Sequence, residues 1–208
     1  MVEIDIEKII TNILDIPRRS MPEWFPRTSQ ALFTLYYLNG KATPQRIKAF
    51  LKEKGYMSYR TFLKAVEVLQ EKNVIRKEYG EYILNPIIYD YLSILAKDLD
   101  RLCNLIRETF NKVKKENNNK EVIQTFEKEI FTILQKHKNN VVRIIEENLP
   151  EVKGIAIFIR ALLFYFSLVI VFASVYVVPL LENLVEIEEI KRLLKKSAAE
   201  VLVKYEYP

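Results

Sequence analysis

The chain has 208 residues, of which 50% are apolar and 28% charged, and its formal net charge at neutral pH is +5. This length allows one large domain or a small domain with an appendage. Only four glycines and eight prolines stand among many Leu, Ile, Lys and Glu residues, a composition that favours helices and argues against extended disorder.

The sequence contains few of the residues on which catalysis or metal binding depends. The single cysteine, Cys103, excludes an internal disulfide and is expected to pack as a small hydrophobe. The single histidine, His137, stands between lysines in "LQKHKNN" and is expected on the surface. Glu186, Glu188 and Glu189 are interpreted as a solvated helix face. Without a phosphate loop or a nucleophile beside a base, we expect no enzyme, no catalytic residue, no cofactor and no metal.

Residues 1–27 are expected to form an N-terminal amphipathic helix and a linker. Apolar residues recur there at helical spacing, and the helix is expected to end before Pro17. Acidic residues occupy the region where an export signal needs basic ones, so no such signal is predicted.

Residues 28–86 are expected to form a compact domain of three helices and a β-hairpin. Each helix has a cap residue before it and a stop after it: Thr28 or Ser29 to Asn39 and Gly40, Thr43 to Gly55, and Ser58 to about Asn73. The apolar period then changes from 3.6 to 2, and two short runs flank Tyr79 and Gly80. This change predicts a hairpin with a tight turn.

The run "SYRTFLKAVEVLQEKNVIRKEYGEYILN" resembles the recognition helix and wing of winged-helix transcription regulators of bacteria and archaea. The shared features are the Ser-x-x-Thr opening, the apolar ladder ending in Leu, and the step into the first wing strand. Asn73, Val74 and Ile75 stand where the family has a Gly-Leu-Ile-like step, a mild departure because Asn tolerates the left-handed conformation. The resemblance implies a winged helix-turn-helix fold and its DNA-binding geometry, but no target gene.

Charge independently supports a DNA-binding surface. Residues 41–77 contain ten basic and three acidic side chains, a local excess larger than that of the whole chain. The candidate base-contacting residues at the start of the third helix are Tyr59, Arg60, Thr61 and Lys64, and the candidate phosphate contacts are Arg46, Lys48, Arg76 and Lys77. Arg60 is the expected guanine reader. The alternatives are a protein-docking module or a surface that serves solubility only.

Residues 87–150 are expected to form an antiparallel helical hairpin. A heptad-like apolar seam in the first helix and a second amphipathic pattern flank the polar run "ENNNK". The hairpin is either a dimerisation arm or a cover for its own winged helix, and the sequence leaves both alternatives open.

Residues 155–181 are expected to form an apolar helix, and the stretch from 161 to 181 has no charge at all. At about 1.5 Å per residue, this stretch is about 30 Å long, enough to cross a hydrocarbon core. Lys153 and Arg160 precede it and Glu182 follows it, which predicts a single-pass protein with a cytoplasmic N-terminal domain. Residues 182–208 would then form an amphipathic tail. The alternative is a cytoplasmic protein in which a second copy covers this helix.

The sequence therefore predicts a mainly α protein: a winged helix-turn-helix domain, a helical hairpin and a long apolar C-terminal helix. Its expected function is that of a membrane-tethered, DNA-binding transcription regulator, similar to archaeal membrane-anchored one-component regulators. The expected partners are double-stranded DNA, membrane lipid through residues 161–181, and a second copy in a homodimer. The alternative is a structural or interaction protein, soluble or of viral or plasmid origin, whose winged helix docks on protein or DNA and whose apolar helix forms a dimer core.

Overall fold

The computed structural model describes the backbone of residues 4–115, 119–148 and 152–205, and the side chains of 4–113, 120–148 and 152–186. Within these ranges the chain is mainly helical, with seven helices and a small three-stranded sheet. The elements are α1 (Ile6–Arg19), α2 (Trp24–Tyr37), β1 (Lys41–Ala42), α3 (Pro44–Lys54), α4 (Tyr59–Glu71), β2 (Ile75–Glu78), β3 (Glu81–Leu84), α5 (Pro86–Lys115), α6 (Asn119–Glu147) and α8 (Ala156–Tyr205). The expected amphipathic pattern of the tail depends mostly on side chains beyond Glu186, which lie outside the described residues.

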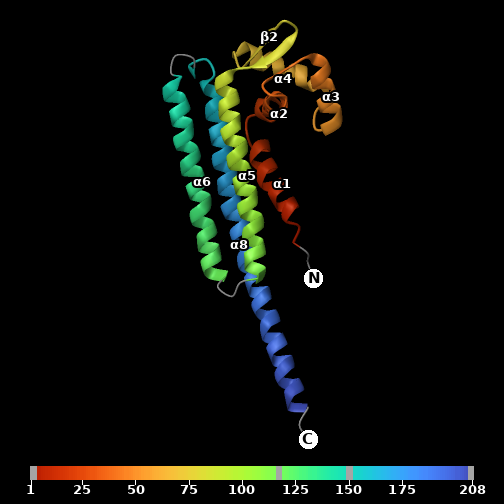
Figure 1. Cartoon of the computed structure of the whole chain (residues 1–208), viewed down its shortest axis with the longest axis vertical. Coiled ribbons are helices and arrows are strands. Elements are labelled where there is room, and N and C mark those ends of the chain that lie inside the picture. Colours follow the sequence, from red (N-terminus) through yellow and green to blue (C-terminus); the bar gives the residue numbers. More distant parts are fainter. Residues whose placement is uncertain (1–3, 116–118, 149–151, 206–208) are drawn as a thin grey trace.

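The segment from α2 to β3 forms a compact unit at one end of the molecule (Figure 1). Its sheet has the order β1-β3-β2 with antiparallel pairing, and Tyr82 of β3 lies opposite Ala42 of β1 and Lys77 of β2. The hairpin predicted around Tyr79 and Gly80 is confirmed, and both turn residues have positive φ. The third strand, β1, was not expected because two residues are too short to show an alternating pattern.

The expected helix caps of α3 and α4 are confirmed. Thr43 accepts a hydrogen bond from the backbone of Arg46, and Ser58 accepts one from the backbone of Thr61. Gly55 ends α3 in the left-handed conformation, with φ of 69°. These local signals place the start of α4 at the residue expected from the sequence.

Two expected boundaries were wrong. Helix α1 continues through Pro17, because a proline this close to the C-terminal end removes only one backbone hydrogen bond. Helix α2 begins at Trp24, before Thr28 and Ser29, whose hydroxyls donate to carbonyls of the preceding turn instead of capping the helix. Pro26 lies in the first turn of α2, where its missing N–H has no intrahelical partner to lose.

The expected helical hairpin is formed by α5 and α6, and it packs within the same chain. Helix α8 runs along both α5 and α6, and α1 packs against α8 and α5 (Figure 1). The hairpin is therefore part of a helical bundle within one chain, and its expected role as a dimerisation arm stays a prediction.

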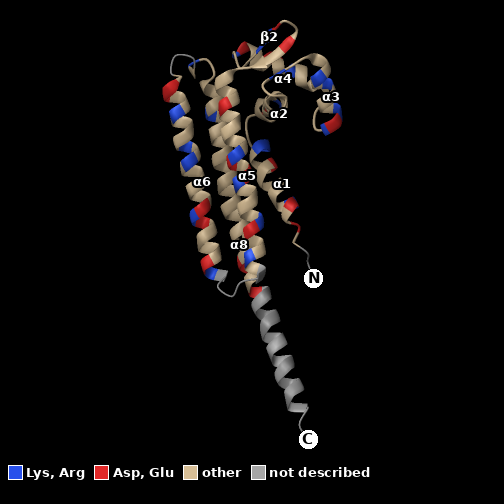
Figure 2. Ribbon diagram, in the orientation of Figure 1, with Lys and Arg blue, Asp and Glu red and all other residues tan. Residues whose placement is uncertain are grey.

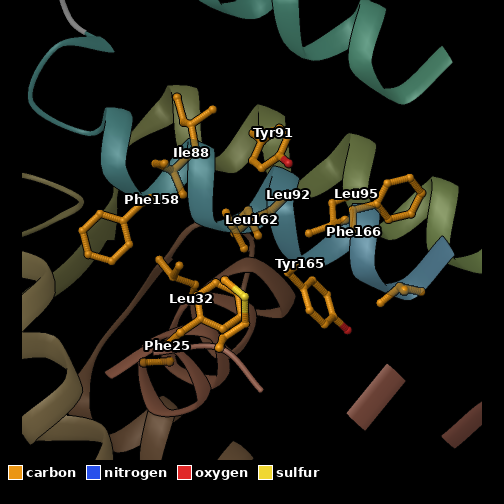
Figure 3. Packing of buried hydrophobic residues seen from close by; sticks show 14 of the residues in the cluster. Phe25, Leu32, Ile88, Tyr91, Leu92, Leu95, Phe158, Leu162, Tyr165 and Phe166 are labelled. Carbon is orange, nitrogen blue, oxygen red and sulfur yellow. The ribbon is translucent and has the colours of Figure 1, made fainter. Parts of the chain in front are cut away.

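The bundle and the compact unit share one continuous apolar core. In Figure 3, Leu162 of α8 lies between Phe25 and Leu32 of α2 on one side and Leu92 and Leu95 of α5 on the other, and all belong to one buried cluster. All five side chains are almost completely buried. The face of α8 that carries Leu162 thus lies in the core of the protein.

Candidate nucleic-acid interface

Helix α4 is held with one face in the core and the other toward solvent. Phe62, Val66 and Leu69 are buried on the inner face, and the ring of Phe62 makes an edge contact with Tyr82 of β3. Arg60 and Lys64 lie on the exposed face, one helical turn apart. Neither forms an ion pair within the part of the chain that the structure describes.

The N-terminal end of α4 brings together basic groups from two other elements. The ammonium of Lys48 in α3 lies 4.8 Å from the centre of the Tyr59 ring, and that of Lys77 in β2 lies 5.4 Å from the centre of the Tyr82 ring. Burial raises the pKa of Tyr59, while the charges of Lys48 and Lys77 lower it. Both ammonium groups therefore act on the same phenol, so three of the expected DNA-binding residues share one surface.

The remaining expected site residues lie at different positions. Thr61 is half-buried, and its hydroxyl is hydrogen-bonded to that of Ser58 at 2.8 Å, so it serves the cap of α4. Arg46 is exposed in the first turn of α3. Arg76 is exposed on β2, but its Nε lies 3.3 Å from Oε1 of Glu78 on the same strand.

The tip of the hairpin carries acidic and aromatic groups. Tyr79 is fully exposed at the turn, between Glu78 and the following Gly80 and Glu81. Figure 2 shows both charge signs on this hairpin. Because carboxylates repel phosphates, the basic residues of the strand and not the tip are suited to contact a nucleic acid.

A second polar group lies inside the bundle and was missed from the sequence. His137 of α6 is completely buried: its Nδ1 lies 2.9 Å from Oδ2 of Asp98 and its Nε2 lies 3.2 Å from the hydroxyl of Tyr91. Its ring packs 4.1 Å from that of Phe166 in α8. The expectation that His137 lies on the surface was wrong, because its lysine neighbours point outward while the helical repeat places position 137 in line with Ile130.

The geometry around His137 resembles a proton relay, but it is closed to solvent. An ionised Asp98 only accepts hydrogen bonds, so Nδ1 carries the proton and Nε2 accepts from the Tyr91 hydroxyl. Burial lowers the pKa of His137, and the hydrogen bond with Asp98 opposes that shift. All three residues are at most 2% exposed, so the group is closed to solvent, and it joins α5 to α6.

Helix α8 combines a buried face with an exposed apolar face. Its segment Ala156–Glu186 is long and apolar enough to cross a membrane, because an 18-residue window within it has a mean hydropathy of 2.5, yet 39% of that window is buried in the protein. Phe166, Val169 and Ala173 face the bundle, whereas Phe164 and Val175 are more than half exposed.

Comparison of the chain with protein-family models, with curated proteins and with solved structures finds no match.

Proposed function

We propose that the segment from α2 to β3 is a winged helix-turn-helix that binds double-stranded DNA, and that the chain is a transcription regulator. The order helix, strand, helix, helix and hairpin supports this reading. The observation that carries the proposal is the convergence of Lys48, Tyr59 and Lys77, from three elements, at the start of a helix whose outer face presents Arg60.

In the proposed complex, the N-terminal end of α4 enters the major groove. Arg60 reaches a guanine edge with its forked guanidinium, and Lys64 follows one turn later. Lys48 and Lys77 flank this end and neutralise phosphates, which positions the helix without reading the sequence. The helix dipole adds to their attraction for phosphate at the same end.

Selection of bound duplexes from a genomic DNA pool by the full chain tests this proposal. We expect Arg60→Ala to relax the sequence preference, and Lys48→Ala to weaken binding to all sequences by a similar factor. Lys136→Ala, on the exposed face of α6 in the bundle, is the matched control and should behave as the wild type. A full chain that fails to retain any duplex at low salt, or an Arg60→Ala variant with an unaltered preference, would overturn the proposal.

The second candidate function adds a membrane tether through α8. It is favoured by the length and apolarity of Ala156–Glu186, and by the basic residues Lys153 and Arg160 before the uncharged stretch. In the packed arrangement α8 lies against α5 and α6, whose outer faces carry many charges, so insertion requires α8 to leave the bundle. A full chain that sediments with membranes after a high-salt wash and needs detergent for release would support the tether; a chain that stays soluble would exclude it.

A further inference from the structure

The exposed face of α8 carries a regular apolar stripe directly opposite its buried face. The members are separated by alternating steps of four and three residues: Ile157, Ala161, Phe164, Leu168, Val171, Val175 and Val178. Four of them are more than half exposed, at 53% for Ile157, 56% for Phe164, 52% for Val171 and 61% for Val175. This spacing is the 3.5-residue repeat by which one helix packs lengthwise against another.

Opposite charges mark the two ends of this stripe. Arg160 lies at its N-terminal end and Glu182 at its C-terminal end, and both are exposed on the same side of α8 as the stripe. They are separated by about 33 Å along the helix at 1.5 Å per residue. Between them the residues beside the stripe are small or uncharged, including Ser167 and Ser174.

We propose that a second copy of this chain covers the stripe, with the two α8 helices packed antiparallel. Antiparallel packing sets Leu168 of one copy against Val171 of the other, and Phe164 against Val175, so the bulkiest member of the stripe meets a smaller one. It also brings Arg160 of each copy within one helical turn of Glu182 of the other. Parallel packing would instead place like charges together at both ends, which disfavours that orientation.

The flanks of the stripe fit a protein partner better than a lipid surface. Helices that lie on membranes carry several Lys and Arg residues beside their apolar face, whereas this stripe is flanked by serines on one side, by the stacked rings of Phe172 and Tyr176 on the other, and by one charge of each sign at its ends. Coverage by a second copy also leaves α8 packed on its own bundle, with Phe166 against His137, so no buried contact has to break.

The association is tested by sedimentation equilibrium of the full chain without detergent over a concentration series. We expect the mass of a dimer for the wild type, and a monomer for Val171→Glu, which places a carboxylate in the stripe. Phe131→Glu is the matched control, because Phe131 is an apolar residue on α6 that is 58% exposed, against 52% for Val171, and lies outside the stripe; this variant should remain dimeric. Circular dichroism checks that each variant is folded. A wild-type chain that is monomeric throughout, or soluble only in detergent, overturns the proposal.

The orientation is tested by reversing the end charges. Arg160→Glu and Glu182→Arg should each weaken the dimer, whereas the double variant should restore it, because antiparallel packing places position 160 within one helical turn of position 182. Cross-linking with a short bismaleimide in a Cys103→Ser background gives a second measure: chains carrying Arg160→Cys should cross-link to chains carrying Glu182→Cys and not to themselves, because the reagent spans the helical turn between these positions. Self-cross-linking of the 160 variant, or a double charge variant no stronger than the single ones, would overturn antiparallel packing. Both tests are independent of DNA binding.

Discussion

The imidazole Nδ1 of His137 lies 2.9 Å from Oδ2 of Asp98, in a bundle core where both side chains are at most 3% exposed. Asp98 also faces the guanidinium of Arg101, at 3.3 Å, which balances its charge while the imidazole stays neutral. The neutral imidazole then accepts a hydrogen bond at Nε2 from the Tyr91 hydroxyl, which keeps its proton. One buried side chain thus satisfies a carboxylate on one side and a phenol on the other.

This arrangement predicts a loss of stability in mild acid. Burial lowers the pKa of His137 in the folded protein, so the unfolded chain takes up the proton first as the pH falls through the ordinary value of 6.5. The free energy of unfolding should therefore have its full value above pH 6.5 and should decrease as the pH falls below it. Because the chain has a single histidine, denaturation by urea at about pH 7.5 and about pH 5.5 isolates this effect.

His137→Gln is the control for that measurement, since glutamine keeps a donor and an acceptor but does not titrate in this range. The pH dependence should disappear in this variant. NMR of the one imidazole in the folded chain gives its pKa directly, and a value at or above that of a free histidine would contradict the prediction.

Removal of the Asp98 carboxylate should cost more stability than removal of its exposed neighbour. Asp98→Ala leaves the Nδ1–H of His137 buried without its acceptor, and we expect a loss of about 1–3 kcal/mol. Asp100→Ala, two residues further along α5 and exposed, should change the free energy of unfolding by less than about 0.5 kcal/mol. If chemical denaturation gave the same loss of stability for Asp98→Ala and Asp100→Ala, the hydrogen bond between Asp98 and His137 would not contribute to the free energy of unfolding.

The sequence predicted the elements that local chemistry determines and missed those that depend on contacts between helices. Helix ends at Thr43, Ser58 and Gly55 could be predicted from the sequence, because each cap involves atoms only a few residues away. The buried state of His137 depends on α5 and α8, which are distant in the sequence, although its register with Ile130 and Val141 was a usable signal.

Among the candidate DNA-binding residues, too, some positions follow from local sequence and others depend on contacts between distant elements. Arg60 and Lys64 were placed on the outer face of α4 by helical periodicity alone. The pairing of Arg76 with Glu78 and the approach of Lys48 to Tyr59 depend on strand twist and on how α3 packs against α4, which no local pattern encodes.

Packing of α8 in the bundle predicts a large difference between two phenylalanines. Phe166 is completely buried against His137, and Phe166→Ala should destabilise the chain by about 3–5 kcal/mol through the cavity it leaves. Phe131→Ala on α6 removes a ring that is 58% exposed and should cost far less. A Phe166→Ala variant as stable as Phe131→Ala in thermal and urea denaturation would mean that α8 is not packed on the hairpin in solution.

Two glycines with positive φ should respond differently to alanine. Gly40 has a φ of 79°, and an added Cβ would lie 3.1 Å from Cδ2 of Tyr89 in α5, whereas Gly55 has a φ of 69° and open space around it. Both substitutions incur the left-handed penalty of about 1–2 kcal/mol. Gly40→Ala should cost more, because Tyr89 must also move, and the two midpoints of urea denaturation measure the difference. A Gly55→Ala variant that is the less stable of the two would contradict this ranking.

The salt dependence of DNA binding should separate lysines that contact phosphates from surface charges that are already paired. If Lys48 and Lys77 neutralise phosphates, each alanine variant should lower the slope of log affinity against log salt concentration by about 1. Arg76→Ala should have a smaller effect, because its guanidinium is already paired with Glu78 and must give up that carboxylate to bind phosphate. Fluorescence anisotropy with one duplex over a salt series measures all three slopes, and Lys136→Ala in the bundle sets the baseline. If Arg76→Ala lowers the slope as much as Lys77→Ala, then the ion pair with Glu78 does not weaken the contact between Arg76 and phosphate. If neither lysine variant differs from Lys136→Ala, then the surface at the start of α4 does not contact phosphates.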